Sequence, residues 1–183
     1  MSLRSPFPPF LTCKLPLRSK NSAGHNRPAS GACYSLPING YCMNSEKISI
    51  VIVDDHQIMR ETWRLVLEQD DRFVVIAECV SGTEAIKAAN DLHFDIMLMD
   101  INMHPVNGFE ATKKILNKRP STKIIGMSVN NQPSYARNML KLGARGFVTK
   151  DSSKHEMIYA ITSVHAGDTY ICEDVRKKMD EPE

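Results

Sequence analysis

From Lys47 onward, short β-branched runs alternate with amphipathic segments, and this alternation limits the folds open to the chain. Five apolar runs begin near residues 48, 73, 95, 123 and 146, and each is followed by apolar residues at helical spacing. Buried strands that are separated by helices predict a parallel sheet covered on both faces. We expect a doubly wound α/β sheet over residues 46–172.

Helix boundary signals agree with this alternation. Ser81 and Ser153 each precede a Glu by three residues, which predicts an N-terminal capping box. Gly143 and Gly167 lie where a helix ends on a left-handed residue. Five βα units of this spacing predict a flavodoxin-like (βα)₅ fold with strand order 2-1-3-4-5.

Residues 1–45 differ in composition from the rest of the chain. They hold no Asp or Glu, five basic residues and six of the ten prolines. Such a segment buries too little apolar surface to offset its chain entropy, so a disordered leader is expected. Two alternatives stay open: upstream sequence ahead of a true start at Met43, or a targeting peptide, against which the prolines argue.

Charge and cysteine content exclude several classes of protein. The net charge of +2 is too small to indicate a nucleic-acid partner, and no apolar run approaches the roughly 20 residues that span a bilayer. The five cysteines show no metal-ligand spacing, so reduced thiols in a cytoplasmic protein without a membrane segment are expected. Residues 173–183 are interpreted as a charged tail that begins a linker.

Chemically active side chains follow four of the five predicted strands. Asp54 and Asp55 follow the first and Asp100 ends the third, while Ser128 and Lys150 end the fourth and fifth. In a doubly wound sheet, ligands bind at the carboxyl ends of the strands. Each residue alone is commonplace, but their joint placement predicts one shared site.

Three carboxylates in one pocket repel one another, and a hard cation such as Mg²⁺ relieves that repulsion. A carboxylate beside the cation can act as nucleophile and form an aspartyl-phosphate. We expect Lys150 and Mg²⁺ to neutralise the phosphoryl oxygens, and the Ser128 hydroxyl to donate to one of them.

At these residues the sequence closely resembles the receiver domain of bacterial two-component response regulators. The resemblance lies in three motifs, residues 51–56, 99–108 and 143–151, and the Val-Asp-Asp-His and Thr-Lys-Asp variants resemble the NarL/LuxR-type subgroup. It implies a phosphoprotein of signal transduction that takes a phosphoryl group from a histidine kinase. It also implies that the protein is not an enzyme beyond its own phosphorylation and dephosphorylation.

The resemblance implies a role for each residue. Asp100 would be the phosphoacceptor, and Asp55, Asp100 and the backbone carbonyl of Asn102 would ligate Mg²⁺, with Asp54 holding metal-bound water. Lys150 and Ser128 would bind the phosphoryl group. Phe147, at the switch-aromatic position, would turn inward on phosphorylation.

The sequence also departs from the family pattern. His104 stands where a proline is usual, with Pro105 after it, so an altered loop with an exposed His104 is expected. Phe147 lacks the hydroxyl of the commoner tyrosine, and Asp151 replaces the proline that many receivers carry after the lysine.

The subgroup usually continues into a DNA-binding output domain, for which the 33 residues after Lys150 leave no room. We interpret the chain as a fragment of a transcription regulator, with a stand-alone receiver as the alternative. DNA would be bound only through an output domain, and a homodimer on phosphorylation is expected. A phosphohydrolase with an Asp nucleophile is disfavoured because Asn102 stands where such enzymes need a second Asp, and the retained site residues disfavour a phosphorylation-inert binding module.

Overall fold

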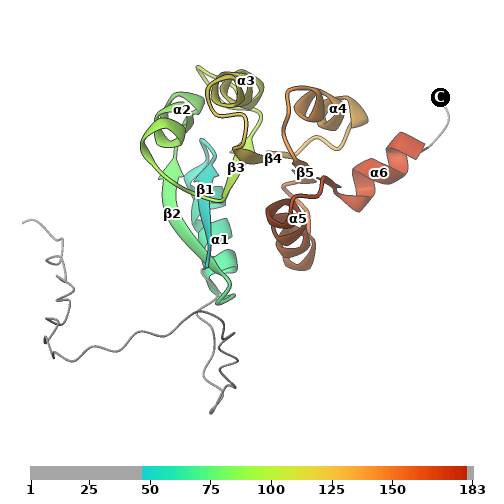
Figure 1. The fold of residues 1–183 in the computed structure, drawn as a ribbon. Coiled ribbons are helices and arrows are strands. Elements are labelled where there is room, and N and C mark those ends of the chain that lie inside the picture. The colour runs from blue at the N-terminus through green and yellow to red at the C-terminus, as the bar shows by residue number, and fades with distance from the viewer. Residues whose placement is uncertain (1–46, 181–183) are drawn as a thin grey trace, which may run out of the picture. The chain divides into compact units, whose positions relative to one another are not determined.

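Six parallel strands form the sheet that organises residues 47–180, the part of the chain that this computed structural model describes (Figure 1). The strands are β1 (Ile48–Val53), β2 (Phe73–Cys79), β3 (Ile96–Asp100), β4 (Lys123–Ser128), β5 (Gly146–Thr149) and β6 (Tyr170–Ile171). Their order is β2-β1-β3-β4-β5-β6, which confirms the predicted order and adds one strand. The predictions for the leader, including a start at Met43, lie outside the described residues.

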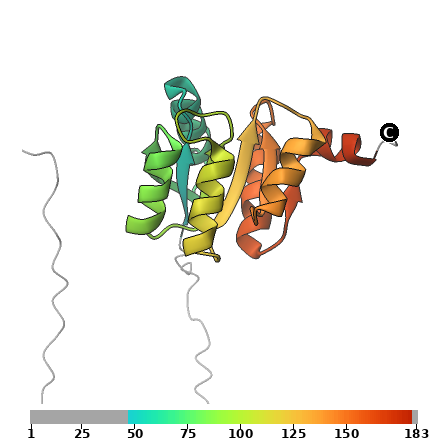
Figure 2. The same ribbon diagram turned by 90° about the horizontal axis from the view of Figure 1, so that it is seen from above.

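Helices cover both faces of the sheet. They are α1 (Gln57–Glu68), α2 (Gly82–Asp91), α3 (Gly108–Lys118), α4 (Pro133–Lys141), α5 (Lys154–Ala166) and α6 (Glu173–Asp180). α1 and α5 lie on one face, and α2, α3 and α4 lie on the other (Figures 1 and 2). Among these helices of residues 47–180, none combines the length and apolar character that crossing a membrane requires.

The predicted helix boundary signals are confirmed. The side chains of Ser81 and Ser153 accept hydrogen bonds from the backbone amides of Glu84 and Glu156, at 3.3 and 3.2 Å. Gly143 and Gly167 have φ values of 99° and 106°, a region that disfavours a side chain. These caps fix where each crossover begins and ends, and so where the strands end.

The hydrophobic core lies on both sides of the central strands. All five residues of β3 are buried, and so are the last four of β1. Such runs, without polar alternation, are typical of parallel sheets enclosed by helices. The core holds these strands in place, and because they are parallel their carboxyl ends lie at the same rim of the sheet.

Three elements differ from the sequence prediction. β2 runs to Cys79, three residues beyond its β-branched run, because it pairs with β1 on both sides of an irregularity between Ile50 and Val51. β6 is a two-residue strand that pairs with β5. Most of the segment expected to be a charged tail is the helix α6, whose Val175 is fully buried.

Candidate phosphoacceptor and metal site

The predicted site residues meet at the carboxyl ends of the central strands. Asp54 follows β1 directly, and Asp100 is the last residue of β3, which pairs with β1. Ser128 is the last residue of β4, and Lys150 follows β5. Parallel pairing brings these ends together, although the residues are up to 96 positions apart in the sequence.

One ammonium group holds two buried carboxylates. Lys150 Nζ lies 2.6 Å from Asp54 Oδ2 and 2.9 Å from Asp100 Oδ2. The side chains of both aspartates are 1% exposed, and these two oxygens have no other hydrogen-bond partner among the described residues. The site therefore has an excess of buried negative charge over its internal cation.

This imbalance is reflected in the pKa values. Burial raises the pKa of the Asp100 carboxyl, repulsion from Asp54 adds to the effect, and Lys150 only partly opposes it. Burial alone would lower the pKa of Lys150, but its hydrogen bonds to Asp54 and Asp100 and their charges outweigh burial and raise it. The lysine therefore stays charged, and the second carboxylate lacks a counter-charge of its own.

The donor set fits a hard divalent cation. Asp54, Asp55, His56 and Asp100 each offer one ligand atom, and these atoms all lie within 4.8 Å of one another. Ligands on an octahedral Mg²⁺ ion with bonds of about 2.1 Å are separated by about 3.0 Å when adjacent and about 4.2 Å when opposite. The carboxylate oxygens can reach such an ion with small side-chain movements.

Two residues of the site were not predicted from the sequence. His56 Nδ1 lies 2.7 Å from Asp55 Oδ1 and 3.2 Å from Asp54 Oδ1. Arg60 is buried in α1, and its Nη1 donates to the backbone carbonyl of Asp54 at 2.8 Å. The signal for Arg60 was present, because it lies three and seven residues before the buried Trp63 and Leu67 on one helix face.

Backbone groups position the remaining residues. The amide of Asn102 donates to Asp100 Oδ1 at 3.2 Å, which orients the carboxylate. The amide of Lys150 donates to the carbonyl of Ser128 at 2.8 Å, and Ser128 Oγ accepts from the amide of Asn130 at 3.0 Å. The proposed role of the Asn102 carbonyl as a metal ligand stays a prediction.

Phe147 is fully buried in this structure. The neighbouring Gly126 leaves room for Met139, since a Cβ there would lie 2.9 Å from Met139 Cε but at an ordinary contact distance of 3.5 Å from Phe147 Cδ2. The Phe147 ring therefore already lies inside in this conformation, and its expected turn on phosphorylation stays a prediction. His104, by contrast, is exposed in its loop, as expected.

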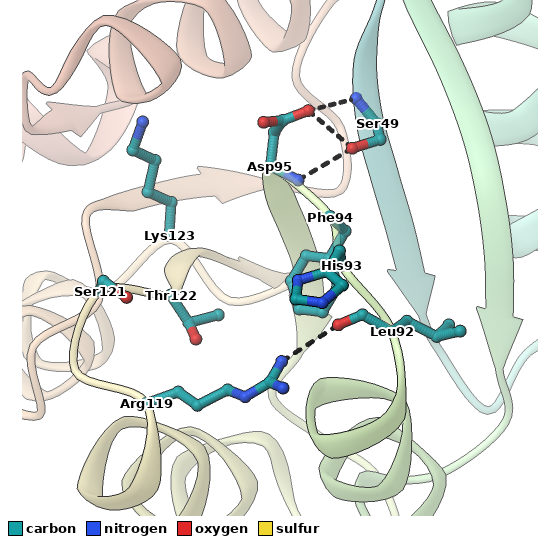
Figure 3. Close-up of a pocket in the computed structure, with 9 residues that line it drawn as sticks. All are labelled: Ser49, Leu92, His93, Phe94, Asp95, Arg119, Ser121, Thr122 and Lys123. Carbon is teal, nitrogen blue, oxygen red and sulfur yellow. Dashed lines mark hydrogen bonds between the residues drawn. The ribbon is translucent and has the colours of Figure 1, made fainter. Parts of the chain in front are cut away.

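A cavity of about 600 Å³ lies at the opposite rim of the sheet, where the strands begin (Figure 3). Two cationic side chains that line this cavity, Arg119 and Lys123, already donate to backbone carbonyls. Arg119 donates to the carbonyls of Leu92 and Asn90, and Lys123 donates to the carbonyl of His165. Because these carbonyls lie at or just beyond the C-terminal ends of α2 and α5, the two cations complement helix dipoles rather than form a ligand site.

Comparison with known proteins agrees with this geometry. Residues 50–162 match the family described as the response regulator receiver domain. Transcriptional regulatory protein DegU of Brevibacillus brevis is 37% identical over 129 residues, which are 70% of this chain and 55% of DegU. The chain spans between 55% and 62% of the length of the curated relatives that it matches.

Solved structures with the same fold include a LuxR-family two-component response regulator from Aurantimonas sp. SI85-9A1. It is 29% identical with a TM-score of 0.71, over 73% of this chain and 96% of that one. The Salmonella typhimurium RcsB response regulator, whose structures are described in terms of DNA interaction, is 26% identical with a TM-score of 0.67. That match covers 73% of this chain and 66% of RcsB.

Proposed function

Because this chain belongs to the receiver domain family of two-component response regulators, in its NarL/LuxR-type branch, we propose that Asp100 accepts a phosphoryl group from a histidine kinase. The single observation that carries this proposal is the contact of Lys150 Nζ with both Asp54 and Asp100. It places a nucleophilic carboxylate and a fixed positive charge at the same point of the rim. In this proposal the protein acts in the cytoplasm.

In the reaction, one carboxylate oxygen of Asp100 forms a bond to phosphorus, and the bond from phosphorus to the nitrogen of the donor histidine breaks. Lys150, held within 3 Å of the acceptor carboxylate, would then pair with a phosphoryl oxygen. The Ser128 hydroxyl would donate to another. Phosphoryl transfer depends mostly on such positioning and charge neutralisation.

Asp54, Asp55, Asp100 and the Asn102 carbonyl would hold Mg²⁺, with Asp54 acting through a water molecule. When bound, the ion would neutralise charge on the carboxylates and on the phosphoryl group. The close approach of the acidic oxygens supports this assignment, because without an ion their repulsion is only partly offset by Lys150.

Mass spectrometry after incubation with acetyl phosphate and Mg²⁺ tests the assignment of Asp100. We expect a single adduct of about 80 Da, the mass of one phosphoryl group. The adduct should be absent from Asp100→Asn and present in the matched control Asp151→Asn, which changes an exposed aspartate nearby. Turnover of a phosphomonoester without an adduct would indicate a hydrolase, and a lack of both adduct and Mg²⁺ binding would indicate an inert module.

We also propose that the domain controls an output that lies elsewhere in a longer protein. RcsB is described as interacting with DNA, and any DNA binding by a protein that contains this receiver would be carried by an output domain. Phosphorylation would favour a homodimer, which light scattering with and without beryllofluoride would detect. The downstream reading frame of the gene would show whether an output domain follows.

A further inference from the structure

Hydrogen bonds tie the loop between β4 and α4 to the site serine at one residue and to the C-terminal helix at a neighbouring residue. Ser128 Oγ accepts from the amide of Asn130 at 3.0 Å, and Asn130 Oδ1 accepts from the amide of Gln132 at 2.9 Å. Between them, Asn131 Oδ1 accepts from Lys178 Nζ at 2.7 Å. The loop between β4 and α4 is therefore held by the site serine at one point and by α6 at another.

α6 is anchored to the body of the domain, which fixes the backbone position from which the Lys178 side chain extends. Val175 is fully buried, Met179 packs against the core, and α6 contacts α4. The start of the helix is tied as well, because Glu156 of α5 accepts hydrogen bonds from the amide of Glu173 at 2.8 Å and from the Tyr170 hydroxyl at 3.2 Å. A displacement of Asn131 beyond the reach of the Lys178 side chain would therefore break this contact or move an anchored helix.

The Ser128 hydroxyl is the group through which phosphoryl binding would disturb this loop. In the resting structure its oxygen holds the amide of Asn130. Because a hydroxyl can donate and accept at once, it is a shift of Oγ towards a phosphoryl oxygen, and not the donation itself, that would weaken its hold on Asn130. Val129, between Ser128 and Asn130, is exposed and offers no packing that would keep the loop in place.

We propose that Lys178 is a positioning residue that acts through Asn131 to hold the loop after Ser128 in its resting position. Docking of α6 then opposes phosphoryl binding, and phosphoryl binding loosens α6 by the same factor, because coupling between two equilibria is reciprocal. This inference rests on the proposed phosphoryl site at Asp100. In this proposal α6 lowers the affinity of the site for a phosphoryl group.

The test measures the affinity of the whole protein for beryllofluoride in the presence of Mg²⁺. Lys178→Met should bind this phosphoryl mimic about two- to fivefold more tightly, the size expected when one exposed hydrogen bond that favours the resting state is lost. Lys178→Arg keeps a donor and should restore the wild-type affinity. Lys177→Met is the matched control, because within residues 47–180 Lys177 Nζ pairs with Glu173 of its own helix and not with the loop, and the affinity of this variant should equal that of the wild type.

Two further measurements separate positioning from a general loss of stability. Asn131→Ala should reproduce the effect of Lys178→Met, and the double variant should show no further gain. Beryllofluoride should also speed hydrogen exchange at the amides of residues 175–180 in the wild type. Equal affinities in the wild type and Lys178→Met, or additive effects in the double variant, would overturn the inference while leaving the phosphoryl site intact. A wild type that binds no beryllofluoride would overturn both.

Discussion

At the scale of single residues, the site is defined by two buried carboxylates that share one ammonium group. The charges of Lys150 and Asp100 contribute to stability in opposite ways. Lys150 offsets repulsion between Asp54 and Asp100, whereas Asp100 is a buried charge whose raised pKa shows that the fold disfavours its ionised form. Substitutions at Asp100 and Lys150 should therefore change stability in opposite directions.

Asp100→Asn should stabilise the protein in the absence of Mg²⁺ at pH 7, because it removes a charge without removing the shape of the side chain. We expect a rise in Tm of about 2–4 °C, which corresponds to ~1 kcal/mol in a chain of this length. A group whose folded pKa is raised destabilises the fold above that pKa and no longer does so below its unfolded pKa, near 3.9. The difference in Tm should therefore shrink as the pH falls, and a difference that grows at acidic pH would contradict the assignment.

Lys150→Met should do the reverse. It leaves two carboxylates buried at 1% exposure without the ammonium group that contacts both, and removal of one partner from a buried ion pair costs about 3 kcal/mol or more. Urea unfolding without Mg²⁺ should show this loss, and added Mg²⁺ should recover part of it. The control Lys87→Met changes an exposed lysine of α2 and should leave the unfolding midpoint unchanged.

The sequence allowed the site to be predicted only as a set of residue types at strand ends. Asp54, Asp100 and Lys150 were identified because a parallel sheet brings such ends together. The sharing of Lys150 between Asp54 and Asp100 depends on side-chain geometry that strand spacing does not encode. The same holds for His56, whose contacts with Asp54 and Asp55 follow from the turn into α1.

At the scale of elements, the connection from β3 to α3 is shaped by close packing behind Asp100. Gly108 begins α3, and its amide donates to the carbonyl of Ile101 at 2.9 Å. A Cβ at this position would lie 2.2 Å from the carbonyl oxygen of Asp100 and 2.8 Å from Ile101 Cα. Only a residue without a side chain lets the helix approach the backbone that carries Asp100.

Gly108→Ala should therefore destabilise the fold by about 2 kcal/mol, in the range observed for overpacking, because backbone atoms must move. It should also slow phosphorylation by acetyl phosphate, because the Asp100 backbone is one of the groups displaced. Gly167→Ala is a useful comparison, since it imposes strain at a φ of 106° but meets no atom within 4 Å. That variant should lose stability without a change in phosphorylation rate; an equal loss of rate in both variants would argue against a local effect at Asp100.

Elements with a strong hydrophobic period were predictable, and those that depend on a partner were not. The five main strands and the helices between them follow from apolar spacing within each segment. α6 offers only Val175 and Met179 as apolar contacts, and their burial depends on neighbouring elements rather than on local pattern. β6 has two residues, and its strand conformation depends on pairing with β5.

At the scale of the whole molecule, two cysteine side chains belong to the hydrophobic core. Cys79 ends β2 and Cys172 follows β6, and both are buried free thiols. Burial raises the pKa of Cys79 from 9.0 to about 11, with a further contribution from the charge of Glu84. Burial also raises the pKa of Cys172. Both thiols should therefore report on opening of the fold as a whole.

A variant with Ser at positions 13, 33 and 42 isolates these two thiols. At pH 8 the folded protein should react with Ellman's reagent far more slowly than the same protein in urea. A rise of two pKa units leaves about 100-fold less thiolate at Cys79, burial raises the pKa of Cys172 as well, and burial adds a steric barrier at both thiols. Two thiols should react after unfolding. Rapid reaction of the folded form without loss of structure would show that the core is more open than described.

The burial of Phe147 also bears on how active the protein is before it is phosphorylated. Because the aromatic ring already lies inside, an inward turn of Phe147 would not distinguish this structure from a phosphorylated one. We therefore expect a longer protein that contains this domain to show background signalling before any stimulus arrives. Its dynamic range would then be set by the loop after Ser128, and not by rotation of the ring.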